Sequence, residues 1–433
     1  MKRNVSLLKA CLIVTNLMVG AGVFINIKPL TAYAGPWGFL GYLIGVVIFL
    51  PVIISLSTLA SIHAVAGGLL VYGKEYLHSA AGFLSAWSYF VGKSVSAALL
   101  SYVLIAPLYM NWPAVHFVPQ WVWTYGFMVF IVLLNIVGVR LGGHIQWLFT
   151  AIKIVPFVAV ISAGAMRGGW AAGGLWSMSY TPDIISIVPI ALFALSGFEV
   201  ICSIGHMIKN PERNARIASI GTALVVAAVY GLFQFCTYVL AGDGLAMAIK
   251  PLEYIAAHLP NGIGNIIDDF MLASVFSGAF SIITNNCWNL YALAKEDYFP
   301  GSKFLTRLTG TGVPWLASFV QVAVACVILS ISVDQISLQN MSVFAMVLAF
   351  WISTIAAFVA FWKNPKISWI IPAIGIVTCA YILFLCFQRL IEFGVSISFL
   401  SVYLFGVVVA LAKYLWDKKN NSKNVLPSPL NNN

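Results

Sequence analysis

Charged side chains are scarce in this sequence. Asp, Glu, Lys and Arg make up 8% of its 433 residues, and only 13 residues are acidic. A typical soluble domain carries about 25% charged residues. Because 61% of the residues are hydrophobic, the composition excludes a water-soluble globular protein. It predicts an integral membrane protein that sits in a lipid bilayer.

Clustered metal ligands and catalytic side chains are also missing. The seven cysteines show no CxxC spacing, and the six histidines show no ligand spacing. We therefore predict free thiols, no metal site and no cofactor. An enzyme would need a cluster of His, Asp or Cys at a membrane face, and a channel would need repeated filter sequences or charged rings. Neither pattern is present, so we expect neither an enzyme nor a channel.

Long apolar runs are what the sequence has in abundance. A spanning helix needs roughly 20 mostly apolar residues. We predict an all-α membrane protein with twelve transmembrane helices, at residues 7–28, 36–60, 83–108, 120–138, 145–166, 184–206, 217–241, 270–294, 313–332, 340–362, 367–388 and 394–415. Short connections indicate one transmembrane domain over residues 1–417. The polar, Asn-rich tail at 418–433 is expected to be disordered and cytoplasmic.

Lys and Arg are unevenly distributed among the connections. With the N-terminus inside, every even-numbered connection is basic, and only Arg167, Lys250 and Arg389 face outward, with Lys28 at a span edge. Because cytoplasmic loops are enriched in Lys and Arg, we predict that both termini are cytoplasmic. The net charge of +10 follows from this topology and gives no reason to propose nucleic-acid binding. The compact loops favour a bacterial inner membrane.

Two short patches interrupt apolar spans near their middles. They are Gly-Ala-Gly at residues 20–22 and Ser-Gly-Phe-Glu at residues 196–199. In a bilayer, non-helical backbone survives only where protein or a cavity covers it. Paired interruptions at corresponding places in two halves of a chain indicate the binding site of a secondary transporter. We therefore place the site at these two breaks.

Four stretches, in the right order along the chain, resemble the amino acid–polyamine–organocation transporters. They are NLMVGAGVF at residues 16–24, FALSGFE at 193–199 followed by KNPERN at 209–214, YALAKEDYFP at 291–300 followed by GTGVP at 310–314, and, more weakly, Gly67-Gly68 with Tyr72. The chain departs from the family where SIGH (203–206) replaces a frequent second acid and where Ala64 replaces a common Pro.

This resemblance implies a five-plus-five inverted repeat (a LeuT-like fold) with discontinuous helices one and six and two additional C-terminal helices. The first repeat would cover residues 7–166, the second 184–362, and the additional helices 367–415. The implied activity is the movement of amino acids or related amines by alternating access.

The first break suits a substrate carboxylate. A helix that restarts there aims backbone N–H groups at an anion, so we expect contacts from Asn16, Gly20, Ala21 and Gly22. The alternative is that the glycines only allow close helix packing.

The second break suits a substrate ammonium. Carbonyl groups near Phe193, Ala194, Ser196 and Gly197 would accept from it. The resemblance implies that Phe193 covers the substrate as an inner gate; the alternative is a lipid-facing aromatic.

Three charged residues fall inside spans away from their ends, where charge is expensive and functional by default. Lys153 stands where the resemblance implies a lysine that takes the place of a coupling sodium ion. The alternative is that Lys153 is a fixed structural cation. Glu199 is either proton-linked or a structural carboxyl. Lys93 in the third span would favour neutral or acidic substrates if it faces the pocket; otherwise it reaches a polar cluster elsewhere.

Two activities remain open from the residues. The first is a proton-coupled, sodium-independent amino acid symporter, with protons and a small amino acid as its partners. The second is an amino acid or amine exchanger of the same fold, for example of the arginine/agmatine type. The sequence predicts no oligomeric state.

Overall fold

The computed structural model describes residues 5–64, 67–137, 143–167, 182–260, 262–364 and 366–423. Within these ranges the regular secondary structure is helical, and one isolated bridge pairs Val5 with Ile208. In chain order the helices are α1 Leu7–Met18, α2 Gly22–Ala34, η1 Gly35–Phe39, α3 Leu40–Ile62, α4 Gly68–Tyr76, α5 Ser79–Asn111, η2 Pro113–Val115, α6 Gln120–Val137, α7 Gly143–Met166, α8 Ile184–Leu195, α9 Val200–Ile204, η3 Gly205–Met207, α10 Pro211–Ala241, α11 Gly244–Met247, α12 Pro251–Ala257, α13 Gly264–Lys295, α14 Ser302–Leu305, α15 Trp315–Ile331, α16 Gln335–Trp362, α17 Ile370–Glu392 and α18 Ser396–Lys423.

The described residues contain 9 helical stretches that are long and apolar enough to cross a membrane. Three shorter apolar helices lie at Leu7–Met18, Ile152–Met166 and Trp315–Ile331. The all-helical class is therefore confirmed, whereas the count of twelve spans stays a prediction. Helix α18 continues to Lys423, so the expectation of a disordered tail was wrong for residues 418–423. Residues 424–433 lie outside the described part.

Both expected breaks are present in the backbone. Helix α1 ends at Met18, where the chain turns so that the Gly20 N–H donates to the Met18 carbonyl at 2.8 Å. Helix α8 ends at Leu195, and Gly197 adopts a φ of +129°. That conformation is open to glycine and strained for other residues. The local sequence therefore accounts for where each helix stops.

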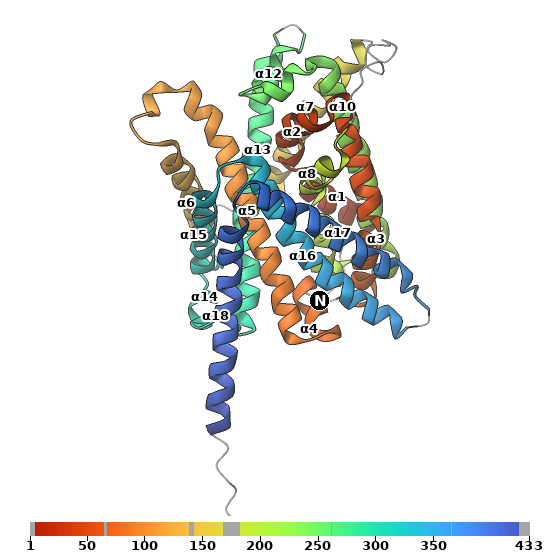
Figure 1. Cartoon of the computed structure of the whole chain (residues 1–433), viewed down its shortest axis with the longest axis vertical. Coiled ribbons are helices and arrows are strands. Elements are labelled where there is room, and N and C mark those ends of the chain that lie inside the picture. Colours follow the sequence, from red (N-terminus) through yellow and green to blue (C-terminus); the bar gives the residue numbers. More distant parts are fainter. Residues whose placement is uncertain are drawn as a thin grey trace, which may run out of the picture.

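Long helices enclose the broken ones. Helix α5 packs along both α16 and α13, and α10 packs along α3. The half-helices lie inside this frame: α1 packs on α10, and α2 packs on α8 (Figure 1). Small residues allow the close approach, as on α5, where a Cβ on Gly92 would stand 2.7 Å from Met346 of α16.

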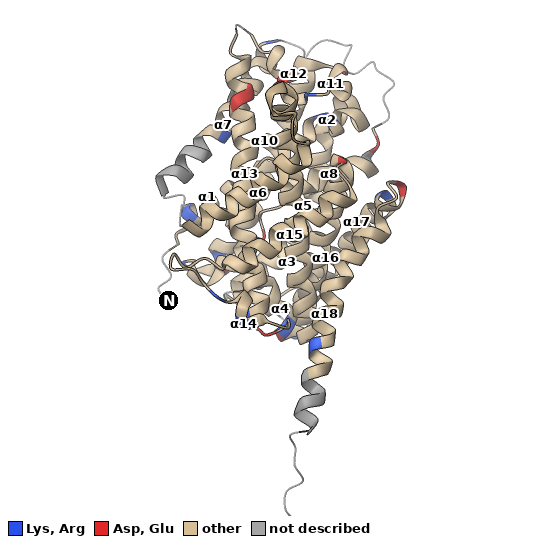
Figure 2. Ribbon diagram, turned by 90° about the vertical axis from the view of Figure 1, so that its left-hand side faces the viewer, with Lys and Arg blue, Asp and Glu red and all other residues tan. Residues whose placement is uncertain are grey.

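Charged residues gather at the two ends of the bundle (Figure 2). At one end Lys74 pairs with Glu296, and this contact raises the pKa of the Lys74 ammonium. Near the same end Lys413 lies 2.9 Å from Asp297 and lowers the pKa of that carboxyl. At the opposite end Arg389 lies 3.2 Å from Asp183. Such pairs near water add little stability, but they mark the two faces of the membrane domain.

Candidate functional site

The two breaks pack directly against each other. A Cβ on Gly197 would stand 2.8 Å from the carbonyl carbon of Leu17 and the nitrogen of Met18. In the same way, a Cβ on Gly22 would stand 2.7 Å from the Cα of Ala194. Contacts this short admit only glycine. The breaks, far apart in sequence, therefore form one unit at the centre of the fold.

The first break presents unpaired helix ends. The amides of Phe24 and Ile25 donate to the Ala21 carbonyl, so the N–H groups of Gly22 and Val23 precede the first hydrogen-bonded turn of α2. On the α1 side, the Tyr230 hydroxyl donates to the Met18 carbonyl at 2.8 Å. Tyr230 thus steadies the backbone where α1 stops.

The second break is held by its own side chains. The Ser196 hydroxyl donates to the Phe193 carbonyl at 3.0 Å, which occupies one of the acceptor positions at the end of α8. The Gly197 N–H donates to Oε2 of Glu199 at 2.6 Å. Glu199 therefore braces the turn from α8 into α9.

A cavity of about 550 Å³ opens onto both breaks. Its lining includes every residue that the sequence put forward for the site: Asn16, Gly20, Ala21, Gly22, Lys93, Lys153, Phe193, Ala194, Ser196, Gly197 and Glu199. A volume of this size suits a small organic ligand. The structure therefore brings these residues together, while their roles stay predictions.

From the breaks, the lining of the cavity continues toward one end of the bundle. Its lining continues to Ile13 on α1, Ser203 on α9 and Asn289 on α13, the side on which α1 begins. On the α2 side of the first break, buried side-chain amides hold α2 in place. The Asn26 amide donates to the Ile190 carbonyl at 2.8 Å, and Gln339 donates to Asn26 at 2.6 Å.

Lys153 reaches the first break from α7. Its side chain is buried, and its Nζ lies 3.5 Å from the Asn16 carbonyl oxygen. The ammonium thus stands between α7 and the last turn of α1. Its role in place of a coupling ion stays a prediction.

Lys93 faces the cavity from α5 and pairs with Glu199. Its Nζ lies 3.2 Å from Oε1 of Glu199, and it stands 5.3 Å from the centre of the Tyr89 ring. The Tyr89 hydroxyl donates to the same Oε1 at 2.8 Å. Glu199 is 3% exposed, so Lys93 has a buried counter-charge that the sequence analysis did not name, and its effect on selectivity stays a prediction.

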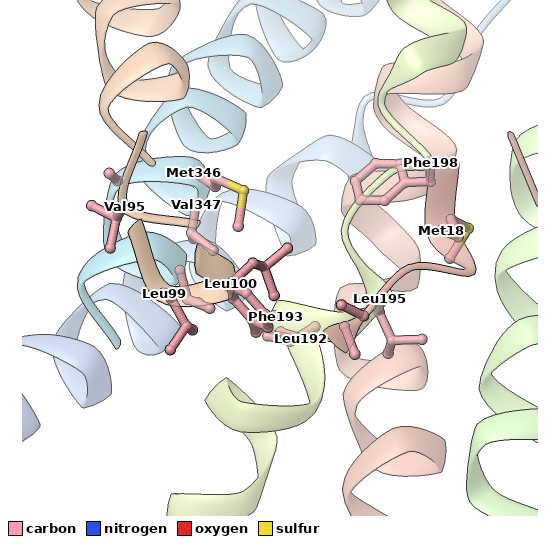
Figure 3. Packing of buried hydrophobic residues seen from close by; sticks show 14 of the residues in the cluster. Met18, Val95, Leu99, Leu100, Leu192, Phe193, Leu195, Phe198, Met346 and Val347 are labelled. Carbon is pink, nitrogen blue, oxygen red and sulfur yellow. The ribbon is translucent and has the colours of Figure 1, made fainter. Parts of the chain in front are cut away.

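Phe193 lies on α8 rather than on the open side of the breaks. It is buried, and Figure 3 shows it beside Leu100 of α5, which lines the same cavity. The lipid-facing alternative for Phe193 was therefore wrong. Phe193 covers the end of the cavity near α8, and its role as a gate stays a prediction.

Several lining residues escaped the sequence analysis. Tyr89 belongs to the stretch around Lys93, but nothing in the sequence linked it to Glu199. Helix α13 contributes Asn285, Asn286 and Asn289, together with Gly278, whose Cβ would stand 3.1 Å from that of Ala21. Three amide side chains close together in an apolar span were the available signal, because uncompensated polar groups are rare at membrane depth.

Broken apolar helices around a central cavity that carries charged and amide side chains are typical of an integral membrane transport protein. The chain belongs to the amino acid permease family, whose model matches residues 10–420. This confirms the resemblance seen in the motifs. Members are transporters rather than enzymes, and among the described residues no group of three or more His, Cys, Asp or Glu could hold a metal ion.

Characterised relatives differ in what their names say they carry. The serine/threonine exchanger SteT of Bacillus subtilis (strain 168) is 24% identical over 382 residues, covering 83% of each chain. The lysine-specific permease LysP of Lactococcus lactis subsp. cremoris (strain MG1363) is 24% identical over 355 residues, covering 76% of this chain and 69% of LysP. LysP of Escherichia coli (strain K12) is 24% identical over 332 residues, covering 71% of this chain and 67% of that LysP.

Proposed function

We propose that this amino acid permease is a proton-coupled, sodium-independent symporter that works by alternating access. The observation that carries the proposal is one cavity whose lining includes both helix breaks and the Lys153 side chain. The substrate carboxylate takes the N–H groups at residues 20–22, and its ammonium takes the carbonyls at 193–197. One zwitterion can bridge both breaks, because the two breaks touch each other.

The proposal includes twelve spans arranged as two inverted repeats, 7–166 and 184–362, followed by two helices at 367–415. Two features support it. The half-helices before the breaks, α1 and α8, each have 12 residues. Helix α8 packs along α2, and the C-terminal end of α8 lies next to Gly22, where α2 begins. The two broken helices therefore run in opposite directions through the site.

We assign the substituted ion charge to Lys153. Its distance of 3.5 Å from the Asn16 carbonyl oxygen supports this role, because an ammonium there can replace a bound cation. Glu199 remains the second candidate for proton coupling. Its three donors, from Tyr89, Gly197 and Lys93, support the structural alternative instead.

The structure corresponds in this proposal to a state open to the cytoplasm. The cavity extends toward the start of α1, and Lys74, Lys303 and Lys363 lie in the connections that we assign to that side. Both termini are then cytoplasmic, and we assign the protein to a bacterial inner membrane because the relatives come from bacteria.

Exchange is the second candidate. It is favoured by the name of one relative, the serine/threonine exchanger SteT. The arginine/agmatine alternative is less favoured, because Lys93 and Lys153 bring two cations to the cavity and Glu199 brings one anion.

The deciding experiment is uptake into proteoliposomes with a panel of labelled amino acids in choline buffer. Accumulation in empty vesicles that requires an inward proton gradient supports symport. Uptake that appears only with internal substrate supports exchange. A protein that is inert in choline and rescued by sodium contradicts the assignment of Lys153.

A further inference from the structure

A separate groove lies at the end of the bundle where α3 stops and α10 begins. It has a volume of about 310 Å³ and is lined by the last turns of α3, the first turns of α10 and the connection between α16 and α17. None of its lining residues borders the central cavity. Two further hollows share residues with it, one at Asn210–Arg213 and one at Trp362–Trp369.

Polar and apolar side chains are layered within this groove. The exposed residues Arg216, Lys366 and Ser368 form its rim. Ile54 lies about two helical turns before the end of α3, so it sits deeper in the bilayer, and Ile371, the second residue of α17, adds an apolar side chain near the rim. A ligand that fits this layering has an anionic head and an apolar tail.

Aromatic side chains place the rim at the surface of the bilayer. Trp362 and Trp369 flank the connection, with ring centres 5.1 Å apart, and are 62% and 43% exposed. Exposed tryptophans of membrane proteins favour the headgroup level. Lys366 lies between them in sequence, so its ammonium stands at the depth of lipid phosphates.

We propose that this groove binds the phosphodiester headgroup of an anionic phospholipid. The Arg216 guanidinium and the Lys366 ammonium hold the phosphate, since basic pockets between helix ends suit anionic headgroups. The Arg216 Nε donates to the Glu212 carbonyl at 2.8 Å, so this bond uses one of the three guanidinium nitrogens. The acyl chains of the lipid run along Ile54 and Ile371. A free phosphate ion has no acyl chain and makes no such apolar contact.

Glu212 also lines the groove and opposes an anion. It reduces the local charge without cancelling it, because Arg216 and Lys366 remain in the same groove and Arg213 lines the adjoining hollow. Because Glu212 repels an anion, the proposal predicts the direction of the change when its charge is removed. Removal of the Glu212 charge should strengthen binding of the anionic lipid.

The test is titration of fluorescent phosphatidylglycerol onto the purified full chain in detergent, which needs no transport activity. The double variant Arg216→Gln/Lys366→Gln should bind roughly tenfold or more weakly, from the loss of two basic contacts. The matched control Lys303→Gln/Arg307→Gln removes two cations near α14, which packs on α13 and α15, and should bind as the wild type does. Glu212→Gln should bind more tightly.

Three further measurements distinguish an anionic phospholipid from other phosphate-bearing ligands and control for misfolding of the variants. Arg216→Lys/Lys366→Arg keeps both charges and should retain binding. Phosphatidylethanolamine and millimolar inorganic phosphate should compete poorly. Equal weakening in the control pair, equal binding of phosphatidylethanolamine, displacement by phosphate alone, or loss of binding in the charge-keeping variant would each overturn the proposal.

Discussion

Lys93 and Glu199 form an ion pair at the edge of the central cavity, with 3.2 Å between Nζ and Oε1. The pair joins α5 to the turn between α8 and α9. It therefore links a continuous helix of the frame to a helix break that is expected to move. Both groups lie within the membrane domain, where little water reaches them. Each charge is therefore stabilised mainly by the other.

The pair should be strongly coupled in stability. We expect Lys93→Gln and Glu199→Gln each to lower the free energy of unfolding by about 3–5 kcal/mol, because each leaves a lone buried charge. The double variant should recover most of that loss. Thermal unfolding of the detergent-purified variants measures this. Losses that simply add in the double variant would contradict the coupling.

Selectivity should change when Lys93 alone is replaced by a neutral amide. Lys93→Asn leaves the Glu199 carboxylate without its cation, so arginine and lysine should gain at least roughly tenfold in binding relative to neutral amino acids. Lys303→Asn, at an exposed position, is the control. If wild-type protein already binds arginine or agmatine most tightly, the role assigned to Lys93 is wrong.

The substrate position can be tested at Gly20 without disturbing the contact between the breaks. A Cβ on Gly20 meets no atom closer than 3.9 Å, whereas one on Gly22 would strike Ala194. We therefore expect Gly20→Leu to fold and to fill the carboxylate site, abolishing substrate binding measured on purified protein. Gly126→Leu, where nothing lies within 4 Å of the new Cβ, is the control. Unchanged affinity in Gly20→Leu would refute the site.

Lys153 should be essential for coupling rather than for folding. Lys153→Ala is expected to abolish uptake driven by a proton gradient while leaving the elution profile and helix content unchanged. If the ammonium replaces a cation at the end of α1, as we propose, Lys153→Arg should retain the charge and part of the uptake. Full proton-driven uptake by Lys153→Ala would remove Lys153 from the mechanism and leave Glu199 as the candidate.

The sequence by itself determined the membrane class, the family, the position of both helix breaks and the residues that surround them. These features are local: apolar runs of about 20 residues are required by the thickness of the bilayer, and Gly20–Gly22 and Ser196–Gly197 interrupt them within a few residues. The motifs around the breaks are equally local. They could be interpreted without knowing which helix neighbours which.

Only the tertiary structure decided which side chains meet. A helix turns by about 100° per residue, so the apolar run around Lys93 does not state whether its ammonium faces lipid, cavity or another helix. Its partner Glu199, and Asn286 on α13, which lines the same cavity, lie far along the chain. The pairing of Lys93 with Glu199 and the reach of Lys153 to Asn16 depend on how separate helices are rotated and stacked. That packing is fixed by close contacts such as Gly197 on Leu17, which no local pattern specifies.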